Sequence, residues 1–227
     1  MDAEIFKAYD IRGIYGDQID EEIAYRLGRA FARVLAERED KGPQELRVGL
    51  GRDMRLTAPM LAARYAAGVR DEGADVVDVG EVGTEVLYFA VASRDLDGGL
   101  MCTASHNPKA WTGAKLVSRG AIALSGDSGI GDVKRVAEAG EPGAPAERRG
   151  ELREEDVSAD FQAAVMRFIE PGRIRPMKVV LDGGNGMAGP TVGPLFDSLP
   201  IDQVRTCLLY TSPSPRDRTR SRMPSSA

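Results

Sequence analysis

The residues best suited to chemistry lie in a short loop that follows an apolar run. Residues 100–104 read as an apolar strand, and Ser105, His106, Asn107 and Pro108 come directly after it. Open α/β sheets place their ligands at the carboxyl ends of strands, so this pattern puts a hydroxyl group at a ligand-binding edge. The loop also holds the only histidine of the chain. The sequence therefore points to Ser105 as the residue around which a site would be built.

Two neighbouring features bear on this loop. Pro108 disfavours a helical conformation for Asn107, which predicts a stiff and extended loop. A second apolar run at residues 113–117 contains Lys115, which could return a cation to the same edge of the sheet.

Two arginines stand next to glycines and could bind an anion. Arg12 precedes Gly13 in a strand and turn expected at residues 4–15, where its guanidinium group could face a phosphate. By itself an Arg-Gly pair is more typical of a solvated turn. In Gly51-Arg52-Asp53, a charge pair that closes the turn is favoured over an anion site.

Alternating helical and strand patterns predict an α/β fold with right-handed crossovers. We expect Asp20, Thr57 and Thr84 to cap helices, and a weak helix at residues 128–139. Strands are expected at residues 46–50, 75–80, 100–104 and 113–117. The pattern alone favours a mostly parallel sheet.

The rest of the chain divides into three parts. Residues 141–156 are polar and contain prolines, and we expect a linker there. Residues 157–204 begin a second α/β unit, with a helix that includes Phe168 and a glycine-rich turn at 182–186, which we interpret as a tight turn rather than a phosphate cradle. Residues 205–227 predict a disordered tail similar to translated vector sequence, with an RNA-binding tail as the alternative.

Composition limits the classes of function. The chain has 227 residues, 42% of them hydrophobic, and a net charge of −5. The five Arg and one Asp of residues 205–227 contribute +4, so the remainder carries −9, which argues against nucleic acid as a partner. Cys102 and Cys207 cannot form a disulfide framework, and Cys102 is expected in the core. Without a signal peptide or a membrane-spanning run, we expect a cytoplasmic protein.

Two motifs together resemble a known family. Thr103-Ala104-Ser105-His106-Asn107-Pro108 followed by Gly113-x-Lys115, with Tyr9-Asp10-Ile11-Arg12-Gly13 upstream, is similar to the α-D-phosphohexomutases, the phosphoglucomutase/phosphomannomutase family. The resemblance runs from about residue 6 to residue 195. It implies a first domain at residues 1–140 with a mixed sheet covered by helices on both faces, followed by the start of a similar second domain.

The resemblance also implies roles for individual residues. Ser105 would be a phosphoserine that gives its phosphoryl group to O1 or O6 of a hexose phosphate and recovers one after the bound bisphosphate has reoriented. Lys115 would transfer a proton or neutralise charge, and His106 would orient the phosphate or the loop. Arg12 would complete the catalytic group, and Tyr9, Arg12 and Lys115 would contact the phosphosugar substrate.

The resemblance implies a cofactor that this chain supports only in part. Mg²⁺ would bind the phosphate on Ser105 and an Asp-x-Asp-x-Asp loop, and no such spacing occurs after Asp182. A hexose 1,6-bisphosphate would prime the serine. We therefore expect the front portion of a phosphohexomutase, with little or no turnover alone.

Other functions stay open at this point. A non-catalytic remnant or binding fragment is the main alternative, and glucosamine phosphate is an alternative substrate. A serine hydrolase is disfavoured because the only histidine directly follows Ser105, where it is poorly placed to reach the hydroxyl, and because no G-x-S-x-G motif occurs. The sequence leaves the oligomeric state open.

Overall fold

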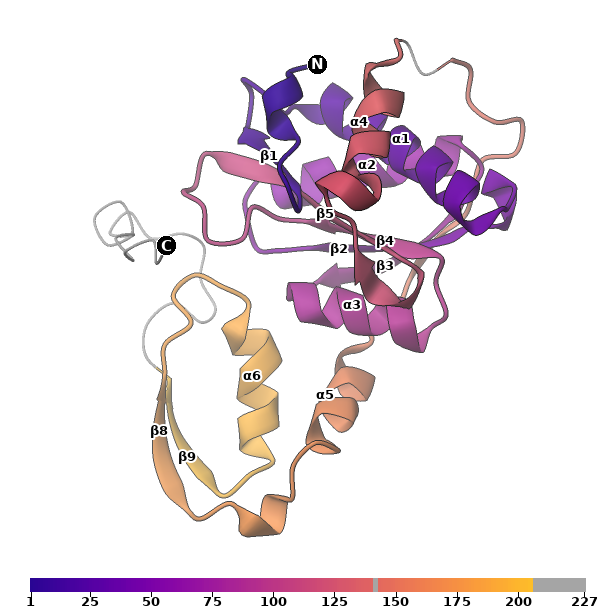
Figure 1. The fold of residues 1–227 in the computed structure, drawn as a ribbon. Coiled ribbons are helices and arrows are strands. Elements are labelled where there is room, and N and C mark those ends of the chain that lie inside the picture. Colours follow the sequence, from indigo (N-terminus) through magenta and orange to yellow (C-terminus); the bar gives the residue numbers. More distant parts are fainter. Residues whose placement is uncertain (141–142, 206–227) are drawn as a thin grey trace. The chain divides into compact units, whose positions relative to one another are not determined.

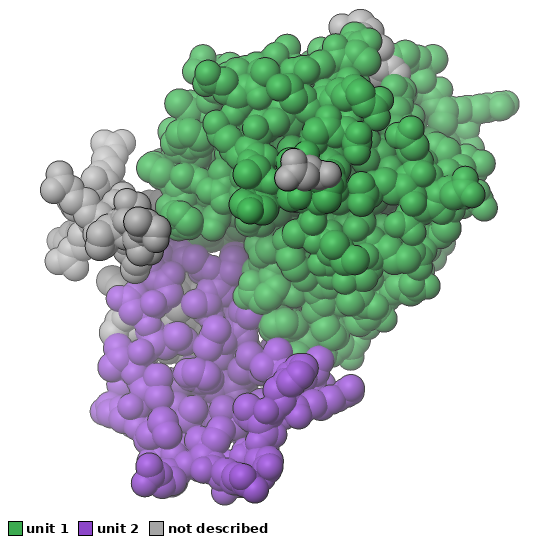
Figure 2. Space-filling model, viewed as in Figure 1, with its two compact units in different colours: residues 1–161 green, residues 162–227 purple. Residues whose placement is uncertain are grey.

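A computed structural model describes residues 1–140 and 143–205 of the chain. It divides into two compact units, Met1–Phe161 and Gln162–Ala227, which Figure 2 shows in different colours. Within the described residues, no helix combines the length and the apolarity needed to cross a bilayer.

The first unit is built on a mixed sheet. Its strand order is β1-β5-β4-β2-β3-β7, with β6 paired to β5. Strands β4, β2, β3 and β7 run parallel, whereas β5 is antiparallel to β1, β4 and β6. The strands are β1 (Ile11–Ile14), β2 (Arg47–Arg52), β3 (Asp75–Glu81), β4 (Gly98–Cys102), β5 (Trp111–Ser118), β6 (Ile122–Ala123) and β7 (Leu152–Glu154). The sheet is therefore mixed, as the family resemblance implied.

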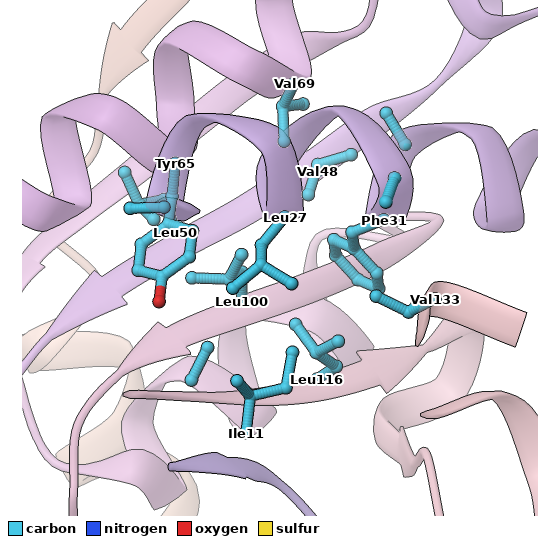
Figure 3. Packing of buried hydrophobic residues seen from close by; sticks show 14 of the residues in the cluster. Ile11, Leu27, Phe31, Val48, Leu50, Tyr65, Val69, Leu100, Leu116 and Val133 are labelled. Carbon is cyan, nitrogen blue, oxygen red and sulfur yellow. The ribbon is translucent and has the colours of Figure 1, made fainter. Parts of the chain in front are cut away.

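Helices cover both faces of this sheet (Figure 1). On one face, α1 (Glu21–Glu39), α2 (Ala58–Asp71) and α4 (Gly131–Glu138) enclose the larger apolar cluster, part of which Figure 3 shows. On the other face, α3 (Thr84–Ser93) packs on a smaller cluster with Met101 and Val117 at its centre. Short helical turns occupy Ala3–Ile5, Pro43–Glu45, Arg119–Ala121 and Gly126–Ile130.

The expected helix caps are confirmed at one site and corrected at two. Asp20 accepts a hydrogen bond from the Ile23 amide at 2.8 Å and caps α1. Thr57 holds the cap position of α2, but its side chain makes no capping bond because its own backbone is already helical. Helix α3 begins at Thr84 itself, and Gly83 is its cap residue.

The close contact between α1 and α2 depends on two glycines, Gly28 and Gly68. A Cβ atom on Gly28 would lie 2.3 Å from the Tyr65 carbonyl oxygen, and one on Gly68 would lie 2.1 Å from that of Tyr25. Because glycine has no Cβ, the two helix backbones can approach this closely.

The segment expected as a linker packs on the first unit where it is described. Strand β7 extends the sheet by pairing with β3. Before it, the Arg29 side chain donates to the carbonyl oxygens of Gly143 and Ala144, and the Gly150 amide donates to the Arg70 carbonyl oxygen. The division between units falls after Phe161. The Phe161 ring makes an edge-to-face contact with Phe89 at 5.6 Å, and both rings are partly buried against the smaller apolar cluster.

The second unit contains one strand-helix-strand motif. Its elements are β8 (Met177–Leu181), α6 (Ala188–Asp197) and β9 (Ile201–Arg205), with β8 and β9 parallel, and a helical turn at Pro171–Arg173 precedes them. Helix α5 (Ser158–Met166) begins in the first unit and is shorter than expected, which leaves Phe168 89% exposed. Residues 206–227, with the expected tail and Cys207, lie outside the described residues.

Candidate functional site

Ser105 follows β4 in a loop that is more compact than expected. Its backbone has φ +52°, in the left-handed region, which costs a non-glycine residue roughly 1 kcal/mol. The amide and side-chain nitrogens of Asn107 both donate to the Ala104 carbonyl oxygen at 3.0 Å, and the Trp111 amide donates to the Pro108 carbonyl oxygen. The prediction of an extended loop was wrong, because these local bonds fold residues 104–111 into consecutive turns.

His106 reaches the hydroxyl of its neighbour. Its Nδ1 atom lies 3.3 Å from Ser105 Oγ, and both residues are exposed. The prediction that an adjacent histidine is poorly placed was therefore wrong, because the left-handed backbone at Ser105 brings the two side chains together. Among the described residues no carboxylate contacts His106, so the three-part arrangement of a serine hydrolase is not present there.

A polar chain behind the loop fixes the amide of Ser105. This amide donates to Thr103 Oγ1 at 2.8 Å, and Thr103 Oγ1 donates to Asp53 Oδ2 at 2.6 Å. Asp53 and Thr103 are both buried. Both charged residues of Gly51-Arg52-Asp53 form ion pairs, each with a partner outside the motif. Arg52 pairs with Asp78 at 3.7 Å and Asp53 with Arg55 at 3.3 Å.

Arg55 is the residue that sequence reasoning missed. Its two terminal nitrogens donate to four carbonyl oxygens of the loop, those of Ser105, Asn107, Pro108 and Trp111, at 2.7–3.2 Å. No pattern in the sequence links Arg55 to the loop, which lies fifty residues further along. Its position two residues after Asp53 was the only available signal.

Strand β1 brings Arg12 level with the carboxyl end of β4, with β5 between the two strands. Arg12 pairs with Gly113 on β5, and the Gly113 carbonyl oxygen accepts the Thr103 amide at 3.0 Å. A Cβ atom on Gly113 would lie 1.9 Å from the Ile11 carbonyl oxygen, so only glycine allows β1 to pair this closely. Arg12 therefore lies within an edge strand rather than in the turn that the sequence suggested.

One carboxylate joins the two expected cations. Asp10 Oδ2 lies 2.6 Å from Arg12 Nη2 and 3.4 Å from Lys115 Nζ. Asp10 is buried, whereas the side chains of Arg12 and Lys115 are 19% and 24% exposed. Two cations on one carboxylate leave a net positive charge at the surface. This group can bind an anion.

The surrounding groups have simpler explanations. Tyr9 is 72% exposed on the turn before β1. Burial raises the pKa of Tyr88, and the nearby charge of Asp10 adds to that increase. Burial also raises the pKa of the Cys102 thiol, which behaves as the small core residue that the sequence predicted.

The described residues do not fit a complete magnesium site. Within residues 1–140 and 143–205, no three His, Cys, Asp or Glu side chains gather to hold a metal ion. A phosphate on Ser105 would supply oxygen ligands of the kind that Mg²⁺ prefers, and the Asp-x-Asp-x-Asp spacing is missing from the sequence.

Comparison with known proteins shows the family to which the chain is similar. Residues 3–139 match the sequence model of phosphoglucomutase/phosphomannomutase, alpha/beta/alpha domain I. Over 188 residues the chain is 42% identical to a phosphomannomutase of Salmonella typhimurium, a match that covers 82% of this chain and 40% of that protein. A phosphomannomutase of Vibrio cholerae is 40% identical over 205 residues, covering 88% of this chain and 43% of its own length.

A solved structure extends the similarity to the fold. The crystal structure of a phosphoglucomutase/phosphomannomutase family protein from Burkholderia thailandensis has a TM-score of 0.79 and 35% identity. The match covers 93% of this chain and 45% of that one, so the chain spans less than half the length of its relatives. The chain belongs to the phosphoglucomutase/phosphomannomutase family, and its residues 3–139 match that family's domain I.

Proposed function

We propose that this chain carries the phosphoserine-bearing part of a phosphohexose mutase, which interconverts hexose 1-phosphate and hexose 6-phosphate. The observation that supports it is the group formed by Asp10, just before β1, Arg12 on β1 and Lys115 on β5, the strand that pairs with β4, which Ser105 follows. A phosphoserine carries about −1.5 to −2 charges at neutral pH, so it requires such cations nearby.

The proposed transfer has two halves. In the first, the bond between phosphorus and Ser105 Oγ breaks as a bond forms to the hydroxyl oxygen at C1 or C6 of the sugar phosphate, and the proton of that hydroxyl passes through His106 to Ser105 Oγ. In the second, the phosphorus–oxygen bond at the other position of the bound bisphosphate breaks as a bond forms to Ser105 Oγ, and the Ser105 proton passes through His106 Nδ1, 3.3 Å away, to the released sugar oxygen.

Lys115 and Arg12 act on charge in this proposal. Lys115 Nζ lies 3.4 Å from a carboxylate oxygen of Asp10, and this ion pair holds its positive charge beside Arg12. We therefore assign Lys115 to charge neutralisation rather than to proton abstraction. Arg12 presents a planar guanidinium group to the phosphate oxygens, and Tyr9 contributes an exposed ring to the sugar side. The steps proposed here use only the chain's own cations.

The test is phosphoryl transfer to the purified chain from labelled hexose 1,6-bisphosphate. We expect one phosphoryl group per chain, located at Ser105 by peptide mass mapping, and none in Ser105→Ala. Ser93→Ala is the matched control, since Ser93 is an exposed serine at the end of α3. Equal labelling of wild type and Ser105→Ala would show that the assignment of Ser105 is wrong.

The same experiment separates the alternatives. A folded wild-type chain that takes no label would favour a non-catalytic fragment. Mannose, glucose and glucosamine bisphosphates, compared as donors, would rank the substrates. We propose mannose and glucose phosphates first, because the relatives compared above are named phosphomannomutases.

A further inference from the structure

We propose that Arg55 is a positioning residue that holds the Ser105 loop, residues 103–111, in the conformation that presents the serine hydroxyl. The inference deepens the proposed function and rests on it for the role of Ser105. It starts from the Gly51-Arg52-Asp53 turn, for which the family resemblance gave no chemical role.

The loop needs an external support because its backbone is unfavourable. Ser105 is in the left-handed region at φ +52°, and an exposed loop would otherwise relax from it. The bonds within the loop, from Asn107 to Ala104 and from Trp111 to Pro108, fix each turn separately. They do not fix the turns relative to one another.

Arg55 supplies this support through its guanidinium shape. Nη2 donates to the carbonyl oxygens of Ser105 and Asn107 at 2.8 and 2.7 Å. Nη1 donates to those of Pro108 and Trp111 at 3.2 and 3.0 Å. A single planar group thereby joins both turns, and the one nitrogen of a lysine could not satisfy four carbonyl groups spread along the loop.

The Arg55 side chain is itself held from behind. Asp53 Oδ2 lies 3.3 Å from Arg55 Nε, and Asp53 Oδ1 accepts the Arg55 amide at 3.1 Å. The same Asp53 accepts the Thr103 hydroxyl, which in turn accepts the Ser105 amide. Arg55 thus binds the carbonyl oxygens of the loop, and Thr103 binds the Ser105 amide. Asp53 contacts both Arg55 and Thr103.

This arrangement gives Arg55 a role distinct from that of Arg12. Its charge points to backbone carbonyl oxygens and to Asp53, and its side chain is only 13% exposed. Arg55 therefore acts on the phosphoryl group through the loop, whereas Arg12 is placed to contact the phosphate.

Hydrogen exchange tests the positioning role without any requirement for activity. In Arg55→Lys we expect the amides of residues 105–107 and 109–111 to exchange about tenfold faster, because one lysine nitrogen cannot replace the four hydrogen bonds from Arg55 to the loop. Arg64→Lys is the matched control, since Arg64 lies on α2 and also donates to a backbone carbonyl oxygen, that of Glu21. Unchanged exchange in Arg55→Lys would overturn the proposal.

Phosphoryl transfer adds a readout that a purely structural role would not move. We expect labelling of Ser105 to fall at least tenfold in Arg55→Ala and to recover when millimolar guanidinium is added. Loss of labelling without recovery, together with unchanged loop exchange, would contradict the proposal. If wild type takes no label, the proposed function fails, and the exchange result alone decides whether Arg55 holds the loop.

A second pair of variants keeps the test valid if Arg55 variants do not fold. Thr103→Val removes the hydroxyl that accepts the Ser105 amide and keeps the side-chain shape. We expect faster exchange at Ser105 in Thr103→Val and wild-type exchange in Thr103→Ser. Equal exchange at Ser105 in the two variants would contradict the proposal that Asp53 supports the loop through the Thr103 hydroxyl as well as through Arg55.

Discussion

The two ends of the same sheet use buried aspartates in different ways. At the amino end of β4, Asp97 is 2% exposed and accepts hydrogen bonds from Lys41 at 2.6 Å, from the Arg47 amide at 2.8 Å and from Arg119. Beside the carboxyl end, Asp10 pairs with Arg12 and Lys115, whose charged groups remain partly exposed.

The difference shows how one kind of ion pair serves either stability or binding. Asp97 joins the end of α1, the start of β2 and the turn at Arg119–Ala121, so its partners hold elements together. Asp10 holds two cations in place and leaves them with net positive charge. The first arrangement predicts a structural role, and the second predicts a site that gains from an anionic ligand.

The largest expected effect is at the amino end. Asp97→Ala leaves Lys41 and Arg119 without their shared buried partner and should lower the free energy of unfolding by about 3–5 kcal/mol. Denaturant unfolding measures this loss. Asp95→Asn is the control, because Asp95 also pairs with Arg119 but is 84% exposed at its side chain, and Asn tolerates its φ of 48°. A similar loss in both variants would remove the contrast.

The next effect is on phosphoryl transfer at the carboxyl end. Arg12→Met or Lys115→Met should reduce the rate of Ser105 labelling roughly 100-fold, while the free energy of unfolding changes by only about 1 kcal/mol. Rapid-quench labelling and denaturant unfolding of the same samples measure the two quantities. If Arg12→Met or Lys115→Met instead lowered the free energy of unfolding as much as Asp97→Ala does, and labelling fell only because less protein was folded, Asp10 would be a structural group like Asp97.

The stabilisation that Asp97 provides at the amino end of β4 should be lost as the pH falls. Burial by itself raises the pKa of Asp97, but hydrogen bonds from Lys41, the Arg47 amide and Arg119 outweigh it and hold the pKa below its ordinary value of 3.8. The stabilisation is therefore complete above about pH 3.8 and is lost as the pH falls through the lower folded-state value. Unfolding measured from pH 6 to pH 2 should show a shallower acid loss in Asp97→Asn than in wild type, and parallel curves would contradict this.

The smallest effect is expected between the two ends. The Tyr65 hydroxyl is buried in the larger apolar cluster, where Figure 3 shows it, and it has no hydrogen-bond partner among the described residues. Tyr65→Phe removes this unsatisfied group and should leave the protein as stable as wild type or more stable by up to about 1 kcal/mol. Thermal unfolding measures the change, and a clear loss of stability would reveal a polar partner for this hydroxyl.

The sequence by itself predicted most of the elements of the first unit and singled out Ser105 as the residue that we propose reacts. Hydrophobic periodicity and the cap at Asp20 are local properties, so the helix over Glu21–Glu39 could be predicted from them. The two motifs around Ser105 and Arg12 carried the family, because their residue types and order are specific. Pattern alone did not establish the mixed sheet, since strand direction depends on pairing between distant segments.

Tertiary structure decided the rest of the site. The left-handed backbone at Ser105, the reach of His106 and the four bonds from Arg55 depend on atoms brought together by folding. Arg55 and Ser105 are fifty positions apart in the sequence, and no local pattern reports a hydrogen bond between a side chain and a remote carbonyl oxygen. The sequence could single out Ser105 as a candidate, but only the packing of β2 beside β4 brings Arg55 to the loop that we propose it holds.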